Sequence, residues 1–229
     1  MRTSIIDLLY HFTDISISTR LFAAYNILDK AVSLCENNAF PSIDLIRNDI
    51  ENYYQTNILF SLDTHLNNIV NEKSRYDFLQ QIYTTIPTST SEVQYAKLVD
   101  QIWEYFARND FKQYLSDLNE FKKHIQSYNH FYVNYWVYRI FSETIRIPDY
   151  SQAKANFIYI AAEFCLFQIM ALVSYSQNGK IDKDEYIYII SRISRMMEHE
   201  SYFRNSVTSK LLKENDLISP AGLLLLLII

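Results

Sequence analysis

The chain has 229 residues, of which 49% are apolar and 21% charged, so it is expected to fold around a sizeable core rather than stay disordered. It holds two glycines, where average usage would give roughly 16. The sequence therefore lacks the glycine-rich motifs that bind phosphates, which argues against a nucleotide-binding Rossmann domain. The net charge of -5, without a basic tract, disfavours nucleic acid as a partner.

Helical periodicity runs through almost all of the sequence, and the shortage of turn glycines favours helices joined by short polar loops. In the first part it predicts a helix over 4–11, a long helix from residue 17 or 18 to 37 or 38, a helix capped by Ser42, and one helix over 62–83. Residues 86–91, proline followed by small polar side chains, predict a loop. We expect a single helical domain over 1–229, with 86–91 as the point of a possible division into 1–86 and 91–229.

Four further helices are predicted near 91–107, 110–127, 130–146 and 152–176, and Asp182 is predicted to cap the next one. The segment 152–176 is apolar around much of its circumference, which predicts a place at the centre of the fold. Because it contains Lys154, Glu163 and Gln168 and lies next to polar turns, we do not interpret it as membrane-spanning. The expected fold class is all-α, a bundle of about nine or ten helices.

The chain ends in seven Leu and Ile residues, 223–229, which are too few to span a bilayer. This run is expected to pack into a groove, to mediate self-association, or to await a partner. The two cysteines, Cys35 and Cys165, are predicted to be buried free thiols. The N-terminus shows no secretory signal, so cytoplasmic residence is the expectation.

The stretch 191–200 is the densest candidate for chemistry. On a helix Arg192, Arg195 and His199 share one face, and Glu198 lies three residues after Arg195. This stripe combines two cations, a carboxylate and a side chain that titrates near neutrality. The alternative is a solvated helix face. The remaining histidines form no metal-binding motif, so no metal site is predicted.

An asparagine among aromatic residues marks the helix predicted over 130–146. Asn134 lies beside Tyr135 and Tyr138 on neighbouring faces. It is either a structural polar anchor or part of a pocket wall, and aromatic rings beside an amide suit a cationic methylene chain such as lysine. A second segment, 174–185, matches part of a calcium-binding loop, but position 1 is a serine, and a helix-ending glycine followed by an aspartate cap explains the same residues.

In its order of features the chain resembles the C-terminal helical part of the flagellin lysine-N-methylases. The matching pieces are S-T-R-L at 18–21, NYWVYRIF at 134–141, the apolar segment, the turn at 179–185, SRISRMMEH at 191–199 and the leucine-rich end. The resemblance covers most of the chain. Family members begin with a cysteine-rich region thought to hold an iron–sulfur centre, and Cys35 and Cys165 cannot supply its ligands.

The resemblance implies methyl transfer from S-adenosylmethionine to a lysine amine of flagellin. Glu198 or His199 would accept the proton that lysine must lose. Tyr135 and Tyr138 would line the lysine channel, with Asn134 as a further substrate-binding residue. Arg195 would orient Glu198 or a cofactor carboxylate. The chain looks like the remainder of such an enzyme after the cysteine-rich region, so it is expected to be weak or inactive alone. The alternative interpretation is a non-catalytic helical module that holds a partner chain.

Overall fold

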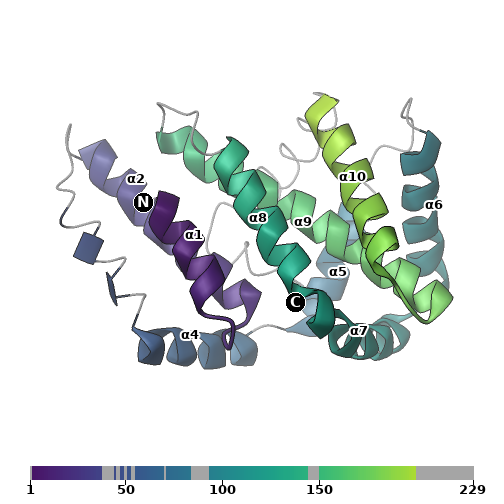
Figure 1. Cartoon of the computed structure of the whole chain (residues 1–229). Coiled ribbons are helices and arrows are strands. Elements are labelled where there is room, and N and C mark those ends of the chain that lie inside the picture. The colour runs from purple at the N-terminus through teal and green to yellow at the C-terminus, as the bar shows by residue number, and fades with distance from the viewer. Residues whose placement is uncertain are drawn as a thin grey trace.

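The computed structural model describes residues 2–37, 44, 47–48, 51–52, 55–69, 71–83, 93–143 and 150–199. Over these residues the chain forms helices and no strand, which confirms the predicted all-α class (Figure 1). In chain order the elements are α1 (Arg2–His11), α2 (Ile17–Asn37), α4 (Thr56–Ile69), α5 (Glu72–Tyr83), α6 (Val93–Arg108), α7 (Phe111–Ile125), the 3-10 turn η1 (Gln126–Tyr128), α8 (Asn129–Glu143), α9 (Tyr150–Asn178) and α10 (Lys183–His199).

Helix α9 forms the centre of the fold, as its composition predicts. Every side chain from 156 to 174 is buried. The helix packs against α2, α6, α7, α8 and α10, and Figure 1 shows it running behind α8 and α10. By length and composition Asn156–Asn178 is the one described segment that passes as a candidate membrane span, but its apolar window is wholly buried inside the fold. Burial of this kind is what a core helix shows.

Most of the predicted helices agree with the structure to within a few residues. The long second helix ends at Asn37, and the helices predicted over 91–107 and 130–146 correspond to α6 and α8. The helix predicted after Ser42 falls largely outside the described residues, and so do the loop at 86–91 and the apolar run at 223–229. The division into domains at 86–91 therefore stays a prediction.

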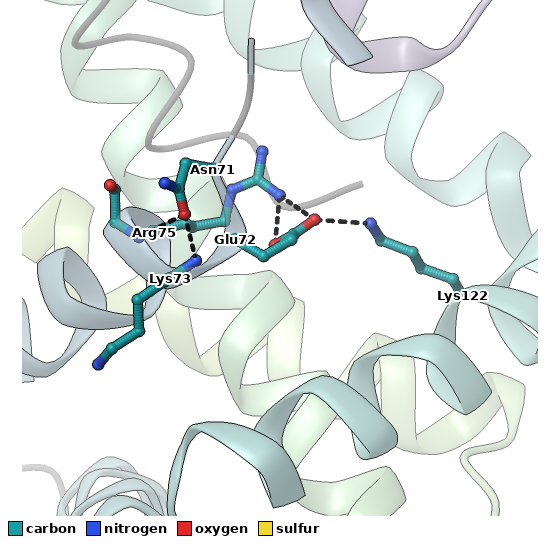
Figure 2. A network of polar contacts seen from close by, with 6 residues as sticks. Asn71, Glu72, Lys73, Arg75 and Lys122 are labelled. Atoms are coloured by element: carbon teal, nitrogen blue, oxygen red, sulfur yellow. Dashed lines mark hydrogen bonds and ion pairs between the residues drawn. The ribbon is translucent and has the colours of Figure 1, made fainter. Parts of the chain in front are cut away.

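The single helix predicted over 62–83 is wrong, because the structure has two helices there, α4 and α5. The break comes at Asn71. Its side-chain oxygen accepts hydrogen bonds from the backbone N–H groups of Lys73 (2.9 Å) and Ser74 (3.3 Å), so Asn71 caps α5 (Figure 2). An apolar period that continues across a cap cannot reveal the break, whereas the Asn-Glu pair at 71–72 is a helix-start signal.

An ion-pair network at the first turn of α5 attaches this helix to α7. The Nη1 atom of Arg75 lies 3.0 Å from both carboxylate oxygens of Glu72, and the ammonium group of Lys122 on α7 lies 3.4 Å from the same carboxylate (Figure 2). The Arg75 side chain is buried, with 5% of its surface exposed, whereas those of Glu72 and Lys122 are half-buried. The carboxylate also lies at the positive end of the α5 dipole, which favours it there.

The turn between α9 and α10 is a glycine cap followed by an aspartate cap. Gly179 has φ of 68°, and its N–H donates to the carbonyl of Tyr175 (2.7 Å), while Asp182 accepts from the backbone N–H of Glu185 (3.0 Å). Ser174 donates to the Glu185 carboxylate (3.0 Å) from within α9. The first positions of the calcium loop considered above are thus helical, and the capping interpretation is confirmed.

Replacing Gly179 by alanine is expected to destabilise the protein by about 1–2 kcal/mol, because a side chain disfavours the left-handed backbone conformation. No atom lies within 4 Å of the position that a Cβ would take, so no clash adds to this cost. Urea unfolding measures the effect. Gly179→Asn is the control and should cost less, since asparagine adopts positive φ more readily. Equal losses for both variants would contradict the backbone explanation.

Candidate functional site

A cavity of about 200 Å³ opens between the end of α1, the start of α2 and the first turns of α8. Its exposed walls are almost wholly apolar, and the predicted substrate-binding residue Asn134 is among its lining residues. We refer to it as the α1–α8 cavity. Its lining residues are Leu9, Tyr10, Thr13, Arg20, Asn129, His130, Val133 and Asn134.

A tight turn after α1 brings the start of α2 to this cavity. The N–H of Ile15 donates to the carbonyl of Phe12 (3.0 Å), and the hydroxyl of Ser16 caps α2 by accepting from the N–H of Thr19 (3.2 Å). Ser16 and Thr19 also donate to Asp63 of α4, at 2.6 and 2.5 Å, which fixes the first turn of α2 against α4. Arg20, the next residue, is thereby held at the cavity.

Arg20 is a buried cation, with 1% of its surface exposed. Its Nη1 donates to the carbonyl oxygen of Leu9, a neutral acceptor, and its buried Nε finds no hydrogen-bond partner in the described part of the chain. Burial lowers the pKa of Arg20 to about 10. A guanidinium presents five N–H donors, so this side chain retains donor capacity beside an open cavity.

The rim of the cavity is formed by exposed polar and aromatic side chains of α1 and α8. The hydroxyl of Tyr10 donates to the side-chain oxygen of Asn134 (2.9 Å), and Tyr10 remains 45% exposed. His130, Asn134 and Tyr138 follow one another at intervals of one turn along α8, and all three are exposed. Tyr138, one turn beyond the cavity, is 55% exposed. Figure 1 shows α1 and α8 side by side here.

Tyr135 lies in a different environment from Asn134 and Tyr138. It is 6% exposed, and its ring stacks on Phe164 at a centroid distance of 6.2 Å and contacts Phe167 at 6.0 Å. Burial, and then the nearby Glu163 carboxylate, raise the pKa of Tyr135 well above its ordinary value. The structure thus brings Asn134 and Tyr138 to one exposed stripe and places Tyr135 in the core between α8 and α9.

A buried ion pair lies close to Tyr135, and the sequence reasoning did not identify it. The Nη2 of Arg139 on α8 is 2.8 Å from Oε2 of Glu163 on α9, and the two side chains are 2% and 0% exposed. Buried charges of this kind are tolerated because they are paired. The signal was present in the sequence, since Arg139 follows Trp136 by three residues on a face that is otherwise apolar, and Glu163 interrupts the most apolar helix.

The polar stripe predicted within 191–200 lies on α10, and the structure describes only part of its side chains. Ile189 and Ile193 are fully buried, as expected for the apolar side of this helix. The guanidinium of Arg192 lies 5.2 Å from the ring centre of Tyr188, and Arg195 is exposed. Glu198 and His199 belong to the last turn of α10, and their side chains lie outside the described residues.

Within the described part of the chain, no group of three His, Cys, Asp or Glu side chains is arranged to hold a metal ion. Cys165 is a buried free thiol, as predicted, and burial raises its pKa to about 12. A thiol with such a pKa is inert as a nucleophile near neutral pH. The side chain of Cys35 lies outside the described residues.

Alkaline pH is expected to destabilise the fold through its buried tyrosines. Burial and then Asp29 raise the pKa of Tyr25 to about 12, and burial raises that of Tyr132 well above its usual value. Below pH 10 tyrosine is neutral in both states, so stability is fully present. As pH rises from 10 toward 12 the unfolded chain loses these protons first, and each tyrosine lowers the unfolding free energy by about 1.4 kcal/mol per pH unit.

Urea unfolding at pH 9, 10 and 11, with tyrosinate absorbance as a second readout, measures this decline. The control is Tyr25→Phe, which should give a shallower slope because one titrating group is gone. A decline that is equally steep in Tyr25→Phe would contradict the assignment.

Comparison with known proteins identifies the family. The family model described as FliB lysine N-methylase C-terminal domain matches residues 2–226. The chain belongs to this family. No curated protein and no solved structure matches the chain. The resemblance to flagellin lysine-N-methylases found in the sequence is therefore confirmed, and a role related to flagellin methylation follows.

Arg20, like the Arg139–Glu163 pair, is a residue of this domain that the sequence pattern did not single out. It belongs to the S-T-R-L segment at 18–21, but no role was inferred for it. Ile17, Arg20 and Ala24 lie at successive helical positions on one face, and all three are buried. The sequence signal for a role of Arg20 was therefore its position on a helical face that is otherwise apolar.

Proposed function

We propose that this FliB C-terminal domain supplies flagellin recognition and part of the active site of a protein-lysine N-methyltransferase. The observation that carries the recognition role is the α1–α8 cavity with its exposed rim. Tyr10, Asn134 and Tyr138 offer aromatic area and hydrogen-bonding groups on a surface that is open to a polypeptide. Tyrosine is enriched at protein interfaces because its ring is apolar and its tip is polar. We expect the domain to act in the cytoplasm.

The proposed methyl donor is S-adenosylmethionine, which bears a carboxylate, an ammonium group, a sulfonium and a ribose diol. In the α1–α8 cavity Arg20 suits the carboxylate, but none of the described lining residues is an Asp or Glu that would meet the ammonium group or the diol. These residues do not fit the whole donor. We therefore propose that the donor binds elsewhere, at the end of α10 or on a cysteine-rich region, and that any iron–sulfur cluster belongs to that region.

Glu198 and His199 are proposed to accept the proton that the flagellin lysine must lose before it attacks. Both lie in the last turn of α10, four and five residues after Ser194. Arg195, one residue beyond Ser194, is exposed and is proposed to orient Glu198. A carboxylate or imidazole within hydrogen-bond reach of the amine accepts its proton as a general base.

Binding of flagellin to the purified chain, measured by biolayer interferometry, tests the recognition role. We expect Asn134→Ala combined with Tyr138→Ala to weaken the Kd at least tenfold, because both side chains are exposed on one stripe. Trp103→Ala is the matched control, since Trp103 is 41% exposed on α6 and does not line the cavity. Absence of flagellin binding, or an equal loss in the control, would contradict the proposal.

Mass spectrometry of flagellin after incubation with the methylase and the donor tests the catalytic role. Glu198→Gln and His199→Ala are expected to abolish methylation while flagellin binding is retained. Methylation that persists in both variants would show the assignment to be wrong. Flagellin binding by a wild-type chain that never methylates would favour the alternative, a non-catalytic module that holds a partner chain.

A further inference from the structure

We propose that the α1–α8 cavity is a binding site for a carboxylate on a short apolar stem, with Arg20 as the group that holds the carboxylate. The shared chemistry is an acidic side chain of a polypeptide or a small free organic acid. Only the first source rests on the proposed flagellin-binding role. The site itself stands on the geometry of Arg20 and the cavity.

The guanidinium of Arg20 is a buried charge that lacks an opposite charge nearby among the described residues. A buried charge is normally paired with an opposite charge, because burial without a partner is costly. Arg20 is 1% exposed and donates to the neutral carbonyl of Leu9, while its Nε has no hydrogen-bond partner among the described residues. Burial alone accounts for its lowered pKa, with no contribution from a carboxylate. Among the described residues the counter-ion is therefore missing.

The lining includes four residues whose side chains carry hydrogen-bond donors, Asn129, His130, Asn134 and Thr13. The surface that the cavity exposes is otherwise almost wholly apolar. A carboxylate accepts several hydrogen bonds at once, and a guanidinium fork matches its geometry. None of the described residues that line the cavity is acidic, so none of them repels an anion.

The apolar part of the cavity lining suits the apolar stem of the proposed carboxylate ligand. Leu9 and Val133 give the cavity apolar walls. An apolar cavity of about 150 Å³ is large enough for benzene, so a cavity of about 200 Å³ admits a chain of a few carbon atoms. A phosphate dianion suits the site less well, because the lining offers a single cation and apolar walls to a strongly hydrated ion. The cation also disfavours the ammonium group of a lysine.

Calorimetric titration of the purified chain with pentanoate and with pentanamide tests the site. The two molecules have nearly the same shape and differ in charge. We expect pentanoate to bind at least tenfold more tightly than pentanamide, and Arg20→Met to weaken pentanoate binding at least tenfold. Equal binding of acid and amide, no binding of either, or unchanged binding in Arg20→Met would overturn the proposal.

Two further variants keep the test valid if Arg20→Met fails to fold. Asn134→Trp changes an exposed position and fills the mouth of the cavity while Arg20 remains, so pentanoate binding should be lost. Arg108→Met removes the same charge from an exposed side chain of α6 and should leave the Kd unchanged. Binding that survives Asn134→Trp, or that falls equally in Arg108→Met, would overturn the site.

Competition distinguishes the two sources of the carboxylate. The probes are the capped tripeptides acetyl-Ala-Glu-Ala-amide and acetyl-Ala-Gln-Ala-amide. Displacement of pentanoate by the glutamate peptide alone supports an acidic side chain as the natural ligand, and displacement by neither supports a free organic acid. Displacement by both peptides equally would overturn a role for charge. None of these measurements uses flagellin, so the result is independent of the proposed recognition role.

Discussion

Replacing Glu163 by glutamine is expected to lower the free energy of unfolding by about 3–5 kcal/mol, because removal of one partner strands the other buried charge. Arg139 and Glu163 are 2% and 0% exposed and lie 2.8 Å apart, so water cannot replace the lost carboxylate. Arg139→Met should cost a similar amount for the same reason. The double variant Arg139→Met with Glu163→Leu should recover much of the loss, since it buries no charge.

Urea unfolding of the four proteins, wild type, two single variants and the double variant, gives the coupling energy of the pair. The matched control is Glu104→Gln, which breaks the Arg108–Glu104 pair on the surface of α6. Those side chains are 75% and 58% exposed, and their contact is 3.2 Å. An exposed pair contributes at most about 1 kcal/mol. If Glu163→Gln costs no more than Glu104→Gln, the buried pair does not stabilise the core.

Trp136→Ala is expected to cost about 3–5 kcal/mol, because it removes the largest fully buried side chain and leaves a cavity in the core. The indole lies against Phe157 and Phe164 of α9, with ring centroids 5.4 Å away in each case. Trp136→Phe should cost much less. It keeps most of the packing, and it removes an indole N–H that has no hydrogen-bond partner.

The chain carries its own control for this substitution, since it has two tryptophans. Trp103 is 41% exposed on α6, and Trp103→Ala should change the unfolding free energy by about 1 kcal/mol or less. Urea unfolding followed by far-ultraviolet circular dichroism is the measurement, because the signal comes from the helical backbone and does not depend on the mutated side chain. Equal costs for Trp136→Ala and Trp103→Ala would contradict the central place of the α8–α9 contact.

Helix positions were predictable because the sequence marks them locally. The cap at Asp182 and the helix-ending glycine at 179 are signals that depend on a few adjacent residues. The break at Asn71 was missed, because the apolar period continues from α4 into α5 and outweighs a single capping side chain. Signals that depend on a few adjacent residues therefore predict the fold class and most helix boundaries. The apolar periodicity that continues from α4 into α5 concealed the boundary at Asn71.

The candidate site was less predictable, because it depends on contacts between distant parts of the chain. Asn134 was found from its aromatic surroundings, but Tyr10, its hydrogen-bond partner, is 124 positions away. Tyr135 and Tyr138 follow each other closely in sequence, and only tertiary packing decides that Tyr135 is buried and Tyr138 exposed. Arg20 and Arg139 interrupt apolar faces, yet the sequence alone does not show what lies opposite them.

The burial of α9 has a consequence for synthesis in the cell. Helix α2 ends at Asn37, and its partner α9 begins only at Tyr150. At about 5–20 residues per second the ribosome needs roughly 5–20 s to make the intervening chain. During this time the apolar face of α2 has no central helix to pack on and is exposed to aggregation. Nascent chains arrested before residue 150 should therefore be targets for chaperones and proteases, even where their individual helices have formed.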